Sequence, residues 1–134
     1  MPVEFLDANV LVYAFTTDRR AAAASALLAR RCVISVQVLN EFANVARRKL
    51  GMTWQEVRES VASITTLCST VLTVEMKTHR DGVRIAEQHG YNLFDALMVA
   101  AALEANAKIL WSEDMHHGMI IDDRLEISNP FLAT

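Results

Sequence analysis

The sequence contains little cysteine, glycine or proline, and each scarcity narrows what the protein can be. Its 134 residues include two cysteines, four glycines and two prolines. Cys32 and Cys68 stand far apart without a C-x-x-C pair, and no signal-peptide pattern precedes them, which favours a reducing cytoplasm. With no linker, low-complexity tract or repeat period, nothing marks a domain boundary. We therefore expect residues 1–134 to form a single domain.

Long apolar runs and a strong net charge are also missing. The longest unbroken apolar run, Ala96 to Leu103, is far shorter than the roughly 20 residues that a membrane span requires, so we expect no membrane association. Thirteen Lys and Arg against sixteen Asp and Glu give a formal net charge of -3. This excludes the overall positive field of a passive nucleic-acid coat protein, so any contact with nucleic acid must be local.

Short apolar runs and segments of helical periodicity alternate along the chain. Strands are predicted over residues 3–6, 32–34, 71–74 and 108–111, with a short edge strand at 125–127. Helices are predicted over 21–31, after the caps Ser35, Thr53, Thr78 and Asn92, with Gly51 and Gly90 at two of the helix ends. The alternation predicts an α/β sandwich around a parallel sheet.

Four acidic residues fall where the predicted strands end. Asp7 directly follows the first strand, and Asp114 follows the fourth after two residues. Glu41 lies in the second turn of the helix that leaves the second strand. Asp95 lies in the first turn of the helix that runs back antiparallel to the fourth strand. Because the carboxyl ends of parallel strands share one edge, we expect all four carboxylates at one rim of the sheet.

A group of neighbouring carboxylates predicts a bound cation. Like charges held close together repel, and some would take up protons unless a cation compensates them. Ligands that are all oxygen select hard ions, which makes Mg²⁺ or Mn²⁺ the expected guest. Such an ion can position a phosphodiester and lower the pKa of a bound water. The four acids therefore predict phosphodiester hydrolysis.

Each of these acids also has an ordinary structural explanation. Asn92 to Asp95 has the form of a capping box, Glu41 can be an exposed helix residue, and Asp114 can be a turn residue. Asp7 has the strongest functional claim, because an acid is a poor strand residue and the sequence gives this one no obvious capping role. Their joint placement at one rim favours the functional interpretation.

Four segments of the sequence resemble a known family. They are Phe5 to Ala14 (FLDANVLVYA), Asn40-Glu41, Asp95 to Ala102 (DALMVAAA) and Ser112-Glu113-Asp114. In this order and at this chain length they resemble the PIN-domain proteins of the VapC toxin type. The resemblance implies a three-layer α/β/α sandwich with a mostly parallel sheet, and an endoribonuclease that depends on Mg²⁺ or Mn²⁺. It also implies a homodimer and a small antitoxin protein whose tail occupies the acidic groove.

The resemblance extends to single residues. It implies that Asp7, Glu41, Asp95 and Asp114 are the catalytic metal ligands, and that Asn9 and Ser112 support them. The segment SEDMHHG at residues 112–118 departs from the commoner S/T-x-D pattern, so the roles of Glu113, His116 and His117 stay open. A zinc site at the two histidines is disfavoured, because adjacent residues rarely face the same ion.

The basic run Arg47-Arg48-Lys49 is the best candidate for a local contact with RNA. Arg48 lies seven residues after Glu41, so it shares a helix face with it about 10 Å along the axis and could bind an adjacent phosphate. A solvated helix end, complementing the helix dipole, is the alternative explanation.

Other functions remain to be weighed against a toxin nuclease. A protein-binding module with the same fold but no catalysis is one, although retention of all four acids argues against it. An RNA-processing nuclease without an antitoxin is another. A phosphoacceptor receiver domain lacks its acceptor acid, since Glu75, Met76 and Lys77 follow the third predicted strand. A phosphatase of the D-x-D type lacks its second acid, since residues 7–9 read Asp-Ala-Asn.

Overall fold

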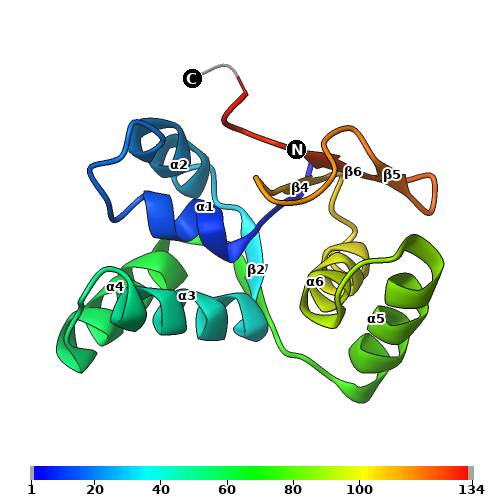
Figure 1. Cartoon of the computed structure of the whole chain (residues 1–134), viewed down its shortest axis with the longest axis horizontal. Coiled ribbons are helices and arrows are strands. Elements are labelled where there is room, and N and C mark those ends of the chain that lie inside the picture. The colour runs from blue at the N-terminus through cyan, green and yellow to red at the C-terminus, as the bar shows by residue number, and fades with distance from the viewer. Residues whose placement is uncertain (1, 133–134) are drawn as a thin grey trace.

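A computed structural model describes residues 2–132 of the chain. Within them, helices and strands follow in the order β1 (Glu4–Leu6), α1 (Ala8–Tyr13), α2 (Ala21–Leu28), β2 (Val33–Ser35), α3 (Val36–Arg48), α4 (Trp54–Leu67), β3 (Thr70–Leu72), α5 (Met76–His89), α6 (Leu93–Glu104), β4 (Ile109–Trp111), β5 (Ile120–Ile121) and β6 (Leu125–Ser128). The alternation of strands and helices is the α/β pattern that the sequence predicts (Figure 1).

The strands form one sheet in the order β3-β2-β1-β4-β6-β5. All neighbours are parallel except β5 and β6, which pair antiparallel. At the centre, β1 pairs on one side with β2, with Phe5 opposite Val33, and on the other with β4, with Leu6 opposite Trp111. The predicted mostly parallel sheet is thus confirmed, and the carboxyl ends of β1, β2 and β4 lie along one edge.

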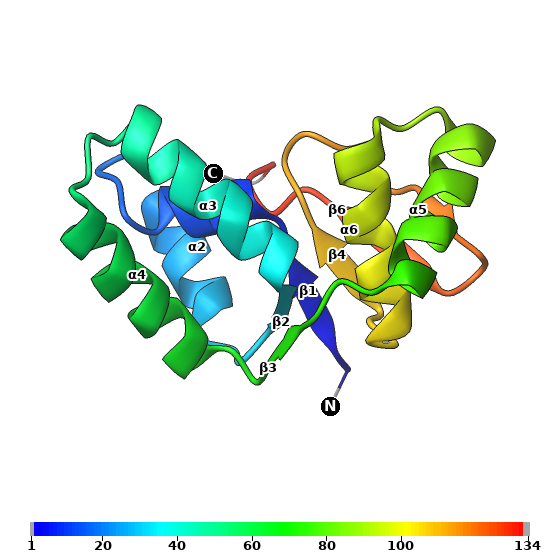
Figure 2. The same cartoon turned by 90° about the horizontal axis from the view of Figure 1, so that it is seen from below.

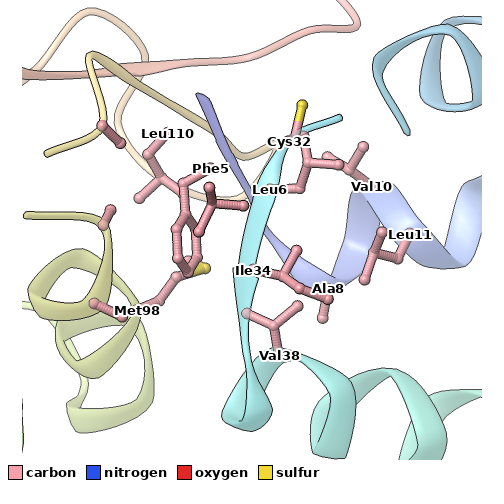
Figure 3. Close-up of a cluster of buried hydrophobic side chains, with 14 of the residues drawn as sticks. Phe5, Leu6, Ala8, Val10, Leu11, Cys32, Ile34, Val38, Met98 and Leu110 are labelled. Atoms are coloured by element: carbon pink, nitrogen blue, oxygen red, sulfur yellow. The ribbon is translucent and has the colours of Figure 1, made fainter. Parts of the chain in front are cut away.

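Helices cover both faces of the sheet. Phe5 and Leu6 are both fully buried, and Figure 3 shows them on opposite sides of the central strands, Phe5 toward Met98 of α6 and Leu6 toward Val10 of α1. Helices α1 to α4 gather on one side and α5 and α6 on the other (Figures 1 and 2). A strand buried on both faces needs apolar residues at successive positions, as β1 has. The three-layer arrangement agrees with the expectation.

Three of the four predicted helix caps are present. Ser35 accepts a hydrogen bond from the backbone N–H of Val38, and Asn92 accepts one from that of Asp95. Thr53 and Glu56 form a reciprocal capping box at the start of α4. Gly90 ends α5 with a φ of 74°, the left-handed conformation expected of glycine there. Among the described residues, no helix is both long and apolar enough to cross a membrane.

The prediction that Thr78 caps a helix is wrong. Helix α5 begins earlier, at Met76, and the Thr78 hydroxyl lies in its first turn, where it accepts a hydrogen bond from the backbone N–H of Glu75. The preceding strand, β3, covers residues 70–72 rather than the predicted 71–74. Helix α2 ends at Leu28, three residues before its predicted end, since Arg31 takes a positive φ of 59° on the way into β2.

Two elements, α1 and β5, were not expected from the sequence, and the position of one strand, β6, was predicted wrongly. Helix α1 has only six residues, and its β-branched valines hide its periodicity. Strand β6 was expected at the sheet edge, yet it lies between β4 and β5. The tight turn from β5 into β6 has Asp122 and Asp123 at φ values of 50° and 57°, closed by a hydrogen bond from the Arg124 N–H to the Ile121 carbonyl. This turn usually carries Asn-Gly or Asp-Gly, so the hairpin signal was absent.

Candidate active site

Asp7 is buried at the end of β1. Only 6% of its surface is exposed, and its carboxylate makes no capping hydrogen bond to α1 although it occupies the cap position. The hydroxyl of Ser112, itself fully buried, donates a 2.7 Å hydrogen bond to Asp7 Oδ2. The pKa of Asp7 is raised from 3.8 to about 6; burial is the largest cause, the hydrogen bond from Ser112 acts in the opposite direction, and the charges of Asp95 and Asp114 add to the rise. The site thus contains a carboxylate whose ionised form is costly.

Asp114 is exposed and lies in the loop that follows β4. The side-chain amide of Asn9, in the first turn of α1, donates a hydrogen bond to Asp114 Oδ2. Asn9 and Ser112, the two residues expected to support the site, therefore each bind one of the candidate carboxylates. Both bonds join the end of β1 to the end of β4, which are adjacent in the sheet.

Asp95 faces the same rim from the first turn of α6. The side-chain amide of its cap Asn92 donates a 3.0 Å hydrogen bond to Asp95 Oδ2. A capping box would instead direct the Asp95 carboxylate to the backbone N–H of Asn92. Burial raises the pKa of Asp95, the bond from Asn92 lowers it, and the charge of Asp114 raises it. The carboxylate is therefore oriented by Asn92 without being used up as a cap.

Glu41 reaches the rim from α3 and is half-buried. Burial and the charge of Asp7 raise its pKa, a hydrogen bond from Gln37 lowers it, and the charge of Asp95 raises it. Gln37 lies one helical turn before Glu41, a spacing at which side chains meet. We did not single out Gln37 from the sequence, although this i, i+4 relation to Glu41 was visible there.

The four carboxylates form one electrostatic unit. Asp7 is affected by Asp95 and Asp114, Glu41 by Asp7 and Asp95, and Asp95 by Asp114. The ion pairs that join described residues involve other acids, namely Asp18, Glu113, Glu4, Asp81 and Asp122. A set of four oxygen ligands with uncompensated mutual repulsion fits a hard divalent cation.

The carboxylates do not yet converge as closely as bound ligands would. Within residues 2–132, no three His, Cys, Asp or Glu side chains are arranged as a ready-made metal site. Asp114 is exposed on a loop and Glu41 and Asp95 are half-buried, so three of the four have room to move toward an ion. The donor chemistry fits a cation, and the side chains would have to close around it.

Comparison with known proteins identifies the family. The model of the PIN domain family matches residues 5–117 of the sequence, which contain all four carboxylates. The chain belongs to the PIN domain family. The motif resemblance stated above is thereby confirmed at the level of the family. A comparison with curated proteins finds no match.

Solved structures share the fold of this PIN domain. Mycobacterium tuberculosis VapC20, described as a sarcin-ricin loop cleaving toxin, has 19% sequence identity and a TM-score of 0.70, covering 83% of this chain and 89% of its own. A toxin-antitoxin complex from Klebsiella pneumoniae has 15% identity and a TM-score of 0.72, covering 96% and 98%. VapBC2 from Rickettsia felis, bound to a DNA fragment from its promoter, has 20% identity and a TM-score of 0.68, covering 95% and 98%.

The loop at residues 112–118, which departs from the commoner motif, makes structural contacts that do not involve the four carboxylates. Both oxygens of Glu113 are engaged, Oε1 by the hydroxyl of Tyr13 at 2.7 Å and Oε2 by Arg20 Nε at 2.9 Å. His117 Nδ1 accepts a hydrogen bond from the backbone N–H of Asn129. Glu113 thus joins the end of α1 and the segment that follows it to the loop after β4, while His117 joins that loop to the chain after β6. Sequence reasoning missed Tyr13 and Arg20, because no local spacing relates them to Glu113.

Proposed function

We propose that this PIN domain is a Mg²⁺- or Mn²⁺-dependent endoribonuclease and the toxin of a toxin-antitoxin pair. The observation that carries the proposal is the joining of Asp7, Glu41, Asp95 and Asp114, from four distant segments, into one repelling group. A structural role for each acid would not require them to share an edge of the sheet. The family match over residues 5–117 supports the same chemistry.

Each carboxylate would have a positioned role around the cation. A divalent ion held by the four acids would neutralise charge on the phosphodiester oxygens and acidify a water molecule. Ser112 favours the ionised form of Asp7, and Asn9 and Asn92 orient Asp114 and Asp95. Such hydrogen bonds to ligands fix their orientation and strengthen metal binding. The chain therefore supplies both the ligands and the groups that hold them.

The proposed partner is a small antitoxin protein. The structures that share the fold include a toxin-antitoxin complex and VapBC2, which supports an antitoxin partner for this chain. A basic side chain from the partner would compensate the same four carboxylates as the cation does, and would thus compete with it. We also propose a homodimer, for which light scattering should give twice the monomer mass of 14.9 kDa.

Cleavage of a mixed RNA pool tests the proposed activity. Purified protein free of antitoxin is incubated with the pool in Mg²⁺ or Mn²⁺, and in EDTA. We expect cutting with the metals, none in EDTA, and none by Asp7→Asn. Glu87→Gln, which removes an exposed charge from α5, is the matched control and should cut like the wild type. Cutting that persists in EDTA or in Asp7→Asn would contradict the proposed mechanism.

A further inference from the structure

A groove adjoins the carboxylate group on the side of Glu41. Its volume is about 360 Å³, and it is lined by Gln37, Asn40, Glu41, Asn44 and Phe94. The first four residues follow the i, i+3, i+4, i+7 pattern and therefore lie along one face of α3. Phe94 comes from the first turn of α6, directly before Asp95. The groove thus has an amide-bearing wall, an aromatic wall and one of the candidate metal ligands at its side.

Phe94 is unusually exposed for a phenylalanine. Its exposed fraction is 59%, similar to the 60% of Trp54 at the start of α4. The Trp54 ring is covered by the guanidinium of Arg47, whose Cζ lies 4.6 Å from the ring centroid. Within residues 2–132, neither a ring nor a cation contacts Phe94 in this way. An aromatic face is therefore left open beside the site.

The amides of the groove are also available. Gln37 is engaged by Glu41, whereas Asn40 and Asn44 are exposed and their side chains form no hydrogen bond with another described residue. An amide side chain carries both donors and an acceptor, the combination that pairs with the edge of a nucleobase. Apart from Glu41 the lining is uncharged, which suits a neutral ring rather than a phosphate or a basic peptide.

We propose that this groove binds one unstacked base of the RNA substrate, with Phe94 stacking on the base and Asn40 and Asn44 bonding its edge. Proteins that recognise single-stranded RNA combine aromatic stacking with hydrogen bonds to base edges in this way. Glu41 belongs both to the groove and to the carboxylate group, so the bound base would lie beside the phosphodiester that is cut. The inference rests on the proposed function, because it names the part of the substrate that the same site selects.

A protein side chain fits the groove less well. An apolar residue of a partner could cover Phe94, but it would leave the amides of Asn40 and Asn44 without partners when water is excluded, which is costly. A base satisfies the aromatic face and the amides together. The groove is therefore assigned to RNA, and binding of a protein there becomes an outcome that the experiment can reveal.

The experiment combines variants of Phe94 with removal of single bases. An RNA that the wild type cuts is first taken from the mixed pool, and copies are made that each lack one base near the cut. Cleavage efficiency in Mg²⁺ is measured for the wild type, for Phe94→Leu and for Phe94→Tyr. Trp54→Leu serves as the matched control, since it removes an equally exposed aromatic ring from another part of the surface.

We expect Phe94→Leu to lower cleavage efficiency by about 5- to 150-fold, the range for loss of one stacked base. Phe94→Tyr and Trp54→Leu should cut like the wild type. At one position, removal of the base should slow the wild type but should not slow the Phe94→Leu variant any further, because both changes remove the same contact. Asn40→Ala and Asn44→Ala should alter the base preferred at that position.

Two results would overturn the assignment of the groove to a base while leaving the nuclease intact. One is that Phe94→Leu cuts like the wild type; if this variant also loses inhibition by the antitoxin, the groove belongs to the protein partner. The other is that removal of a base slows Phe94→Leu as much as it slows the wild type at every position. If the wild type cuts no RNA at all, the proposed function itself fails and the base-binding assignment falls with it, a distinct result.

Discussion

Replacing Asp7 by Asn should make the metal-free protein more stable while abolishing its activity. The pKa of Asp7 is raised from 3.8 to about 6 in the folded state. That difference corresponds to about 3 kcal/mol of cost for keeping the ionised carboxylate in the folded protein above pH 6. Asn has no charge to bury and can still accept the hydrogen bond from Ser112. We therefore expect a gain of about 1–3 kcal/mol at pH 7.5 in EDTA.

The dependence on pH follows from the sign of the shift. A raised pKa means that the folded state holds the proton of Asp7 more tightly than the unfolded chain does. Between about pH 4 and pH 6 the unfolded chain has released this proton while the folded protein keeps it, so wild-type stability falls as the pH rises. The advantage of Asp7→Asn should thus be small near pH 4 and reach its full size above pH 6.

Urea unfolding followed by far-ultraviolet circular dichroism measures the difference. The two proteins are compared at pH 4.5 and pH 7.5 in EDTA, with Glu87→Gln as a control that should stay within about 0.5 kcal/mol of the wild type. Adding Mg²⁺ should stabilise the wild type, by about 2.7 kcal/mol at a hundred times its dissociation constant, and the variant much less. Two results would refute the reasoning. One is that Asp7→Asn is less stable than the wild type at pH 7.5 in EDTA, and the other is that its gain in the free energy of unfolding is the same at both pH values.

Three further changes test other parts of the site. Ser112→Ala removes the hydroxyl that lowers the pKa of Asp7, so the acidic limb of the pH-rate profile should move to higher pH. The free energy of unfolding should fall by about 1–2 kcal/mol. An acidic limb at the wild-type pH would contradict this role of Ser112. Arg48→Ala should weaken RNA binding and lower the slope of log affinity against log salt concentration by about one. Its Mn²⁺ affinity, measured by calorimetry, should be unchanged. RNA binding equal to that of the wild type would show that Arg48 does not contact the RNA. Glu113→Gln removes the negative charge that pairs with Arg20, so it should keep wild-type Mn²⁺ affinity and lose about 1 kcal/mol of stability. A large drop in Mn²⁺ affinity would place Glu113 among the ligands.

The position of the acids at the rim of the sheet could be predicted because all strands of a parallel sheet end at the same edge. Once short apolar strands alternate with helices, an acid within a few residues after a strand must lie near its carboxyl end, as Asp7 and Asp114 do. Local capping signals were equally dependable at Ser35, Thr53 and Asn92, because a cap is decided by residues three positions apart. These features depend only on neighbours in the sequence and on the handedness common to such folds.

Contacts between distant segments could not be predicted in the same way. The bonds from Asn9 to Asp114 and from Ser112 to Asp7 cross more than a hundred residues of sequence, and no spacing rule relates their ends. The groove beside Glu41 depends on where the first turn of α6, with Phe94, lies relative to α3, which the sequence alone does not specify. The turn at Asp122 and Asp123 was missed for a different reason, since two non-glycine residues adopt left-handed conformations there.

The position of β1 in the sheet determines when the site can first exist. Strand β1 is synthesised early, yet one of its two neighbours is β4, with Glu4 opposite Ile109. During translation the ribosome must add most of the chain before that neighbour is made, and Asp114 follows it. A growing chain therefore carries at most three of the four candidate carboxylates until Asp114 has been added. If the proposed function is correct, a chain that has not yet reached β4 cannot assemble the site that would cut the RNA around it.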